Sequence, residues 1–290
     1  MKQTPRIASL PPAFGSWRDI RPLVAVVSAR YRTLLQYRAA AFAGFATQLF
    51  WGAIRLMILA AFFAAATEPQ PMNLTEVVAY VWLGQALLGM LPWNVDADFR
   101  QQIRDGTVAY DLLRPLDLYS YWYGRTLGFR VAAPTLRGIP MVLFAMVLLP
   151  LAGLGDWALI PPASAVAFAG FVGSLVLAAM LATAVTLLAH ISLLWTISGV
   201  GVDRILTVLV TIFSGLVVPL PLFPDWLQPF LNWQPFRGLA DVPYRIYSGN
   251  IPPAEIVPEL VFILVWTVAL VLLGRLILLR GVRRMVVQGG

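Results

Sequence analysis

The chain alternates between long apolar runs and short polar segments that carry most of its charges. A helix needs about 20 mainly apolar residues to cross the hydrocarbon core of a bilayer. We therefore expect six transmembrane helices, at roughly 39–64, 74–93, 131–153, 163–189, 201–220 and 257–279. The pattern predicts an all-α integral membrane protein with one transmembrane domain at 39–279.

The composition agrees with a membrane setting. Apolar residues make up 59% of the 290 residues and charged residues 12%, whereas soluble domains are about one-quarter charged. Cysteine is absent. This excludes disulfides, thiol nucleophiles and Cys-ligated metals.

The basic residues predict the orientation, because Lys and Arg are retained on the cytoplasmic side. They concentrate in an N-terminal segment at 1–38, a loop at 94–130 and a tail at 280–290, and are absent from the loops at 65–73 and 154–162. We expect a multi-pass protein of the cell (inner) membrane with both termini cytoplasmic. The net charge of +7 then reflects topology and contact with membrane lipids, not nucleic acid.

The segment 21–40 has helical spacing of apolar residues, with Val24, Val27 and Tyr31 on one side and arginines interleaved. This pattern is typical of an amphipathic helix in the plane of the membrane interface. It anchors the chain to lipid, contacts a partner, or does both.

The loop at 94–130 contains the ordered stretch RQQIRDGTVAYDLLRPLDLY, Arg100 to Tyr119. We expect a polar helix that stops at Gly106 and a second short helix capped by Thr107 and ended by Pro115. In the second helix Val108 and Ala109 each precede a leucine by four residues, so the pairs share one surface. Two turns are not stable alone in water, so the segment must dock, unless it is only a solvated loop.

Two stretches resemble a known family. IRDGTVAYDLLRPLDLY is similar to the cytoplasmic coupling segment of ATP-binding-cassette (ABC) exporter permeases of the type-2 class. QPFRGLADVPYRIYSG, Gln234 to Gly249, resembles the proline-phenylalanine segment before the last span of that family, and AYVWLGQALL at 79–88 resembles the second span of one uncharacterised branch. The resemblance covers nearly the whole chain.

The resemblance implies a permease subunit that dimerises, with a heterodimer favoured, and that couples to two ATPase subunits. Its substrate would be a hydrophobic or amphipathic compound, such as a lipid, glycolipid or drug, and its outward direction rests on the resemblance alone. A P-loop requires a lysine near the phosphates, and the only lysine here is Lys2. We therefore expect no enzyme activity and no cofactor in this chain, with ATP and Mg in the partner.

The short helix of the loop would then transmit displacement between the ATPase and the spans. We expect the leucines to fill a groove of the partner, Arg114 to pair with an acidic partner or cap the helix end, and the glycine and proline to limit the helix. The expected contact residues are Gly106, Asp111, Leu112, Leu113, Arg114 and Pro115.

Inside the membrane, Gln48 and Arg55 lie seven residues apart on one side of the first span. A central arginine costs about 2.5–3.5 kcal/mol on translocon scales, so it should face protein or water. Arg55 either lines the translocation path or the dimer seam, or it snorkels to the outer headgroups, which we expect slightly more.

The segment 217–249 has too many prolines for one straight helix. By resemblance it forms an outer re-entrant gate of short helices, with Pro235, Phe236, Arg237 and Pro243 as gate residues. The alternative is an aromatic belt at the interface. Arg237 and Arg245 would neutralise Asp241 or meet lipid phosphates.

The sequence fits two other classes of membrane protein poorly. An intramembrane enzyme would need a base near its serine, but His190 and Ser214 are expected about 20 Å apart along the membrane normal. An ion-driven transporter would prefer acidic residues deep in the spans, whereas Glu76, Glu259 and Asp203 lie near span ends.

Overall fold

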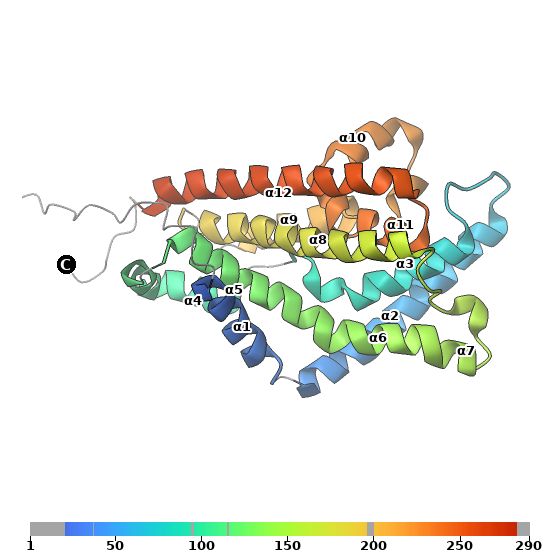
Figure 1. Ribbon diagram of the computed structural model, residues 1–290, viewed down its shortest axis with the longest axis horizontal. Helices are drawn as coiled ribbons and strands as arrows, with labels where there is room; N and C mark the ends of the chain where they lie inside the picture. Colours follow the sequence, from blue (N-terminus) through green and yellow to red (C-terminus); the bar gives the residue numbers. More distant parts are fainter. Residues whose placement is uncertain (1–20, 37, 94–95, 115, 196–199, 283–290) are drawn as a thin grey trace, which may run out of the picture.

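The long helices lie side by side along the long axis of the molecule (Figure 1). The structure, a computed structural model, describes residues 21–36, 38–93, 96–114, 116–195 and 200–282. Within these ranges every regular element is a helix, and four helical stretches are long and apolar enough to cross a membrane. These four are Phe42–Ala65 of α2 (Arg38–Ala65), the stretch Leu118–Leu151, α8 (Ala165–Ser192) and α12 (Pro253–Val282).

The stretch Leu118–Leu151 is one helix with two wider turns. It consists of α5 (Leu118–Ala133), α6 (Ile139–Leu143) and α7 (Leu149–Leu151), joined by π-helical turns at Pro134–Gly138 and Phe144–Leu148. The predicted third span at 131–153 overlaps this stretch, while the helix itself begins earlier, at Leu118. The carboxylate of Asp117 caps the true start by accepting a hydrogen bond from the Ser120 backbone N–H at 2.9 Å.

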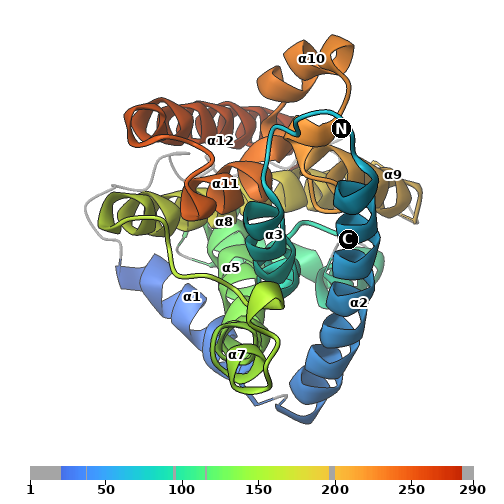
Figure 2. The ribbon, with the colours of Figure 1, turned by 90° about the vertical axis from the view of Figure 1, so that its right-hand side faces the viewer.

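Two predicted spans are shorter than expected. α3 (Leu74–Ala86) continues into a 3₁₀ turn, η1 (Leu88–Met90), and α9 (Val200–Phe213) ends where Gly215 takes a left-handed φ of 81°. Helices of 13 and 14 residues extend only about 20 Å, against about 30 Å for the hydrocarbon core. α3 is nonetheless the centre of the core, since every residue from Val77 to Ala86 is buried and the other helices surround it (Figure 2).

The short elements gather at the two ends of the bundle. At one end, the α4 end, lie α1 (Arg21–Leu34), α4 (Ala97–Arg104) and the 3₁₀ helix η2 (Thr107–Leu113). At the other, the α11 end, lie η5 (Gly155–Trp157), η6 (Leu220–Leu222), η7 (Asp225–Leu227), α10 (Gln228–Trp233), η8 (Pro235–Leu239) and α11 (Asp241–Ser248). The predicted division of 217–249 into several short helices is confirmed.

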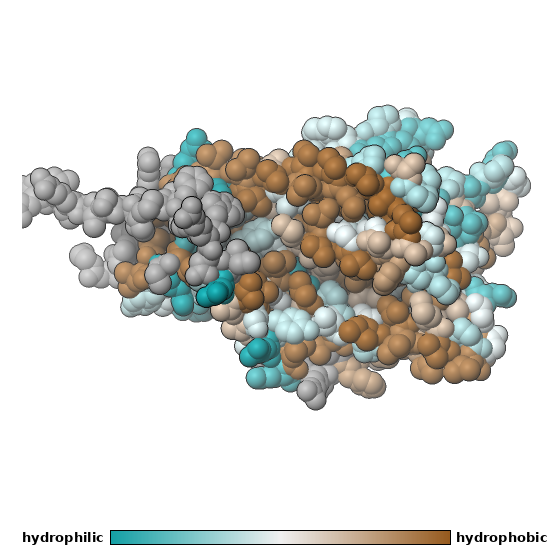
Figure 3. Space-filling view, viewed as in Figure 1, coloured by the Kyte–Doolittle hydropathy of each residue, from teal (hydrophilic) through white to brown (hydrophobic). Residues whose placement is uncertain are grey.

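The sides of the bundle are apolar. Hydrophobic residues cover the middle of the face in Figure 3, with hydrophilic residues gathered toward the ends. On α12 the buried residues Ile256, Ile263 and Gly274 follow one side, while Val261 and Leu272 are exposed. An exposed surface of this kind is stable in lipid, where apolar side chains need not be covered by protein.

Candidate functional site

The segment between α3 and α5 folds into two short helices separated by a glycine. α4 begins after Asp96, whose carboxylate accepts a hydrogen bond from the Asp98 backbone N–H at 3.0 Å. It ends before Gly106, whose φ of 70° is a left-handed conformation that favours glycine. The predicted stop at Gly106 is confirmed.

The second helix differs from the prediction. η2 is a 3₁₀ helix, in which side chains three residues apart align, whereas the prediction assumed α-helical spacing. The side chains of Val108 and Ala109, on which the predicted pairs depend, lie outside the described part of the structure. Thr107 is also not the cap. Gly106 occupies that position, and the Thr107 hydroxyl donates back to the Gln102 carbonyl at 3.4 Å.

The 3₁₀ winding aligns Tyr110 with Leu113 and leaves both exposed, by 70% and 80%, with Leu112 beside them at 39%. We call these three side chains the Tyr110–Leu113 surface. Clustered large apolar groups outside the spans mark interaction sites. The sequence prediction missed Tyr110, although its three-residue spacing from Leu113 was visible. Pro115 lies outside the described residues.

Asp111 points inward instead of contributing to this surface. Its buried carboxylate accepts hydrogen bonds from the Trp122 indole N–H at 3.0 Å and from Arg114 Nε at 3.1 Å. Arg114 in turn lies 4.6 Å from the centre of the Tyr121 ring. The placement of Asp111 in the contact surface is corrected: it anchors η2 to α5, and Arg114 pairs within the chain.

We expect Asp111→Ala to loosen η2 without changing the Tyr110–Leu113 surface. A buried indole N–H left without an acceptor costs about 1–3 kcal/mol. Amide hydrogen exchange in residues 107–113 should therefore accelerate by roughly tenfold or more. Asp111→Asn is the matched control, because its amide oxygen can still accept from Trp122. Equal exchange in all three proteins would contradict the anchoring role.

A cluster of charges lies behind the two short helices. The carboxylate of Asp96 forms ion pairs with Arg30 of α1 at 3.0 Å and with Arg125 of α5 at 3.8 Å. Arg30 also forms an ion pair with Asp98 at 3.1 Å. The backbone N–H of Asp96 donates to Nε2 of His190 on α8 at 3.0 Å. One residue at the start of α4 thereby joins α1, α5 and α8. His190, expected to be a satisfied helix-end residue, has a partner at Nε2, whereas its buried Nδ1 has no hydrogen-bond partner among the described residues.

The rest of α4 is held by stacking and by a second ion pair. Phe99 is buried between the rings of Trp122 and His190, with centroid distances of 4.7 and 4.4 Å. Arg100 pairs with Asp203 near the start of α9. Two adjacent residues of α4 therefore contact α5 with α8 and α9.

The end of α3–η1 is fixed by buried polar contacts. Arg130 of α5 donates to the Leu91 carbonyl at 2.6 Å and to the Thr186 hydroxyl at 2.9 Å. Thr207 of α9 donates to the Trp93 carbonyl at 2.8 Å. A displacement of α4 would thus reach α5, α8 and α9 through direct contacts, and it would reach the end of α3–η1 through Arg130 and Thr207.

The helix predicted in 21–40 is present as α1, and it packs on α5. Gly128 and Gly124 allow this close approach: an added Cβ would lie 2.8 Å from the Val27 carbonyl oxygen at the first and 2.5 Å from Leu23 at the second. The packing directs Arg30 at α4.

Arg55 does not snorkel to headgroups. Its guanidinium donates to the Leu216 carbonyl at 2.6 Å, and an added Cβ at Gly84 would lie 3.8 Å from both Arg55 Nη1 and the Tyr244 ring. The side chain therefore faces protein at the junction of α2, α3 and α11. Gln48, also predicted on this side of α2, is buried.

Arg237 is not an outer basic residue facing lipid. It is 7% exposed and forms a two-point ion pair with Glu259 of α12, at 3.1 and 2.7 Å. It also lies 4.2 Å from the centre of the Phe262 ring. The expectation that Arg237 neutralises Asp241 or meets lipid phosphate is corrected.

Several hydrogen bonds at the α11 end converge on the side chain of Asp241. Its carboxylate, 1% exposed, accepts from the Tyr80 hydroxyl at 3.0 Å, the Leu220 backbone N–H at 3.1 Å and Arg245 at 3.3 Å. Its own N–H donates to the Ser214 carbonyl at 3.0 Å. The expected pairing of Arg245 with Asp241 is confirmed.

The remaining predicted gate residues lie in the same segment. Pro235 begins η8, and the Phe236 backbone N–H donates to the Gln234 side chain at 2.6 Å. Pro243 is buried in the first turn of α11. The structure thus places all four predicted gate residues on two consecutive short helices that pack between α3, α8 and α12.

Comparison with known proteins gives one result. No significant match was found among the curated proteins or the solved structures. The model of the family described as ABC-2 family transporter protein matches residues 49–289. This match includes the Tyr110–Leu113 surface, the α11 end and the charge cluster on α4 except Arg30 of α1. The chain therefore belongs to the ABC-2 family, the membrane-spanning permeases of ABC transporters.

Proposed function

We propose that this chain is the permease subunit of an ATP-driven exporter and that the Tyr110–Leu113 surface docks into separate ATPase subunits, two per transporter. One observation carries the proposal. A seven-residue helix presents large apolar side chains outside the spans, although it cannot be stable alone, and it is anchored to the bundle by a buried carboxylate. ATP and Mg would bind in the partner, because this chain has no P-loop.

The proposal includes six spans with both termini in the cytoplasm of a cell whose inner membrane holds the protein. The helices α3 and α9, although shorter than the other spans, support this count, because each extends between the two ends of the bundle. The α3–η1 segment extends from Glu76, which accepts from Asn250 at 3.3 Å, to Leu91, which accepts from Arg130. α9 extends from Asp203, which pairs with Arg100, to Ser214, which accepts from Asp241. The basic residues place the α4 end in the cytoplasm.

The proposed transporter contains two permeases, with a heterodimer favoured. Exposed apolar residues on α2 and α9, including Trp51, Ile58 and Ile205, offer surface for a second permease or for lipid. Arg55 beside Tyr244 would lie near the path or seam, and the segment 217–249 would gate the outer exit. The substrate class is a hydrophobic or amphipathic compound, in keeping with the apolar interior.

The test is purification of the tagged chain from native membranes followed by reconstitution of whatever co-purifies. We expect mass spectrometry to identify a P-loop ATPase, and we expect release of a fluorescent lipid analogue to require hydrolysable ATP. Release should persist when an ionophore collapses ion gradients. Gradient-dependent release without any ATPase would overturn the proposal and favour an ion-driven transporter.

A further inference from the structure

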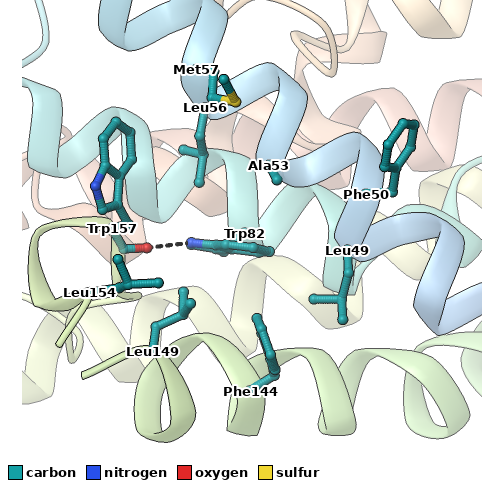
Figure 4. A pocket seen from close by; sticks show the side chains of 10 residues that line it. All are labelled: Leu49, Phe50, Ala53, Leu56, Met57, Trp82, Phe144, Leu149, Leu154 and Trp157. Atoms are coloured by element: carbon teal, nitrogen blue, oxygen red, sulfur yellow. Dashed lines mark hydrogen bonds between the residues drawn. The ribbon is translucent and has the colours of Figure 1, made fainter. Parts of the chain in front are cut away.

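A pocket of about 390 Å³ lies between α2, α3 and the α6–α7 part of the long helix (Figure 4). Leu49, Ala53 and Met57 line it from α2, and Phe144 and Leu149 line it from the facing helix. The volume is many times that of one water-sized group. It is separate from the Tyr110–Leu113 surface and from the hydrogen bonds around Asp241.

The back of the pocket is closed by an aromatic ring from α3. The indole N–H of Trp82 donates to the Trp157 carbonyl at 2.7 Å, as the dashed line in Figure 4 shows. This bond satisfies the polar atom of Trp82, so the ring presents its apolar face to the pocket. Water gains too few hydrogen bonds in such a lining to occupy it stably.

The position of the pocket determines what fills it. Its walls belong to two helices that are long and apolar enough to span a membrane, and Phe50 and Met57 at its rim are exposed. The mouth therefore opens on the lipid-facing surface. Empty space would forfeit dispersion contacts on every wall, and the abundant group at this depth is an acyl chain.

The charge beside the lining restricts the headgroup. The loop at 154–162, which follows α7 and supplies Leu154 and Trp157 to the lining, contains Asp156 but no Lys or Arg. Asp156 lies next to the lining residue Trp157. This acidic border disfavours an anionic headgroup and suits an amine. We propose that the pocket holds one acyl chain of a lipid with an uncharged or zwitterionic headgroup, bound whether or not the transporter is active.

The test uses the full chain in vesicles that contain a phosphatidylcholine with a diazirine on its acyl chain. After illumination, labelled residues are identified by mass spectrometry. Labelling at Met57, Leu149 and Trp157 should saturate at a low fraction of probe, and unlabelled phosphatidylcholine should compete. Labelling at the exposed residues Val265 and Leu272 of α12 should rise linearly, as expected for bulk lipid.

Two variants and one cross-link sharpen the test. Ala53→Phe fills the pocket from its exposed rim and should lower pocket labelling about fivefold or more, whereas Ala269→Phe on the exposed face of α12 should change nothing. Linear labelling of the pocket in the unaltered chain would overturn the proposal. So would equal labelling by a phosphatidylglycerol probe, or efficient disulfide dimerisation of Met57→Cys, which would mean that a second copy covers the site.

Discussion

Replacing Leu112 and Leu113 together with aspartate should abolish recovery of ATPase subunits with this chain and leave the permease folded. Both side chains are exposed, so two carboxylates cost the isolated permease little. In the complex they would have to be desolvated in an apolar groove. Disrupting such a contact costs about 2 kcal/mol or more, so affinity should fall by at least about 30-fold. Co-purification followed by quantitative mass spectrometry measures the loss.

The matched control is Trp226→Asp at the α11 end. Trp226 is 79% exposed and Leu113 80%, so the two changes add a carboxylate at equally exposed apolar positions. The control should retain the ATPase, while Tyr110→Asp should reproduce part of the loss. If the double variant keeps its ATPase while Trp226→Asp loses it, the coupling surface lies elsewhere.

Local sequence rules predicted the limits of this segment better than its interior. Gly106 ends α4 because a left-handed residue is needed there, a requirement visible in the sequence. Within η2, Asp111 accepts a hydrogen bond from Trp122, eleven residues away on the next helix. Asp111 is buried while Tyr110 is exposed, and no spacing rule within residues 107–113 contains that contact.

Two arginines show the same limit over longer distances. The sequence marked Arg55 as a residue that should face protein or water, and it placed Arg237 at the outer face. Their partners, Leu216 and Glu259, lie on elements whose packing is set by the fold as a whole. The span count meets a related difficulty, since α3 and α9 are apolar over the predicted length, but Gly215 and the η1 turn end them early.

One connection between the two ends of the bundle passes through α3. Its η1 end is held by Arg130, and its other half is held by Asp241 through Tyr80. A movement imposed on α4 would reach α3 through α5 and then reach the segment 217–249 without passing through lipid-exposed residues. In the proposed transporter, this is the route by which ATP hydrolysis would change the outer gate.

The segment 217–249 should be most sensitive to the loss of Glu259. Glu259→Gln leaves Arg237 buried beside an uncharged amide, with its two-point ion pair lost. Removing one partner of a buried ion pair costs about 3–5 kcal/mol, because the remaining charge is desolvated without compensation. Unfolding in mixed micelles should show this loss, and limited proteolysis should begin within residues 217–249.

Glu255→Gln is the control, one turn away on α12, because Glu255 is exposed. It should leave stability unchanged. The double variant Arg237→Met with Glu259→Leu should recover most of the lost stability, since apolar residues of similar size often replace a buried pair at no cost. Recovery of stability without recovery of transport would assign the pair to gating, whereas recovery of both would make it a structural contact between η8 and α12. A Glu259→Gln protein as stable as the Glu255→Gln control would contradict the buried pair itself.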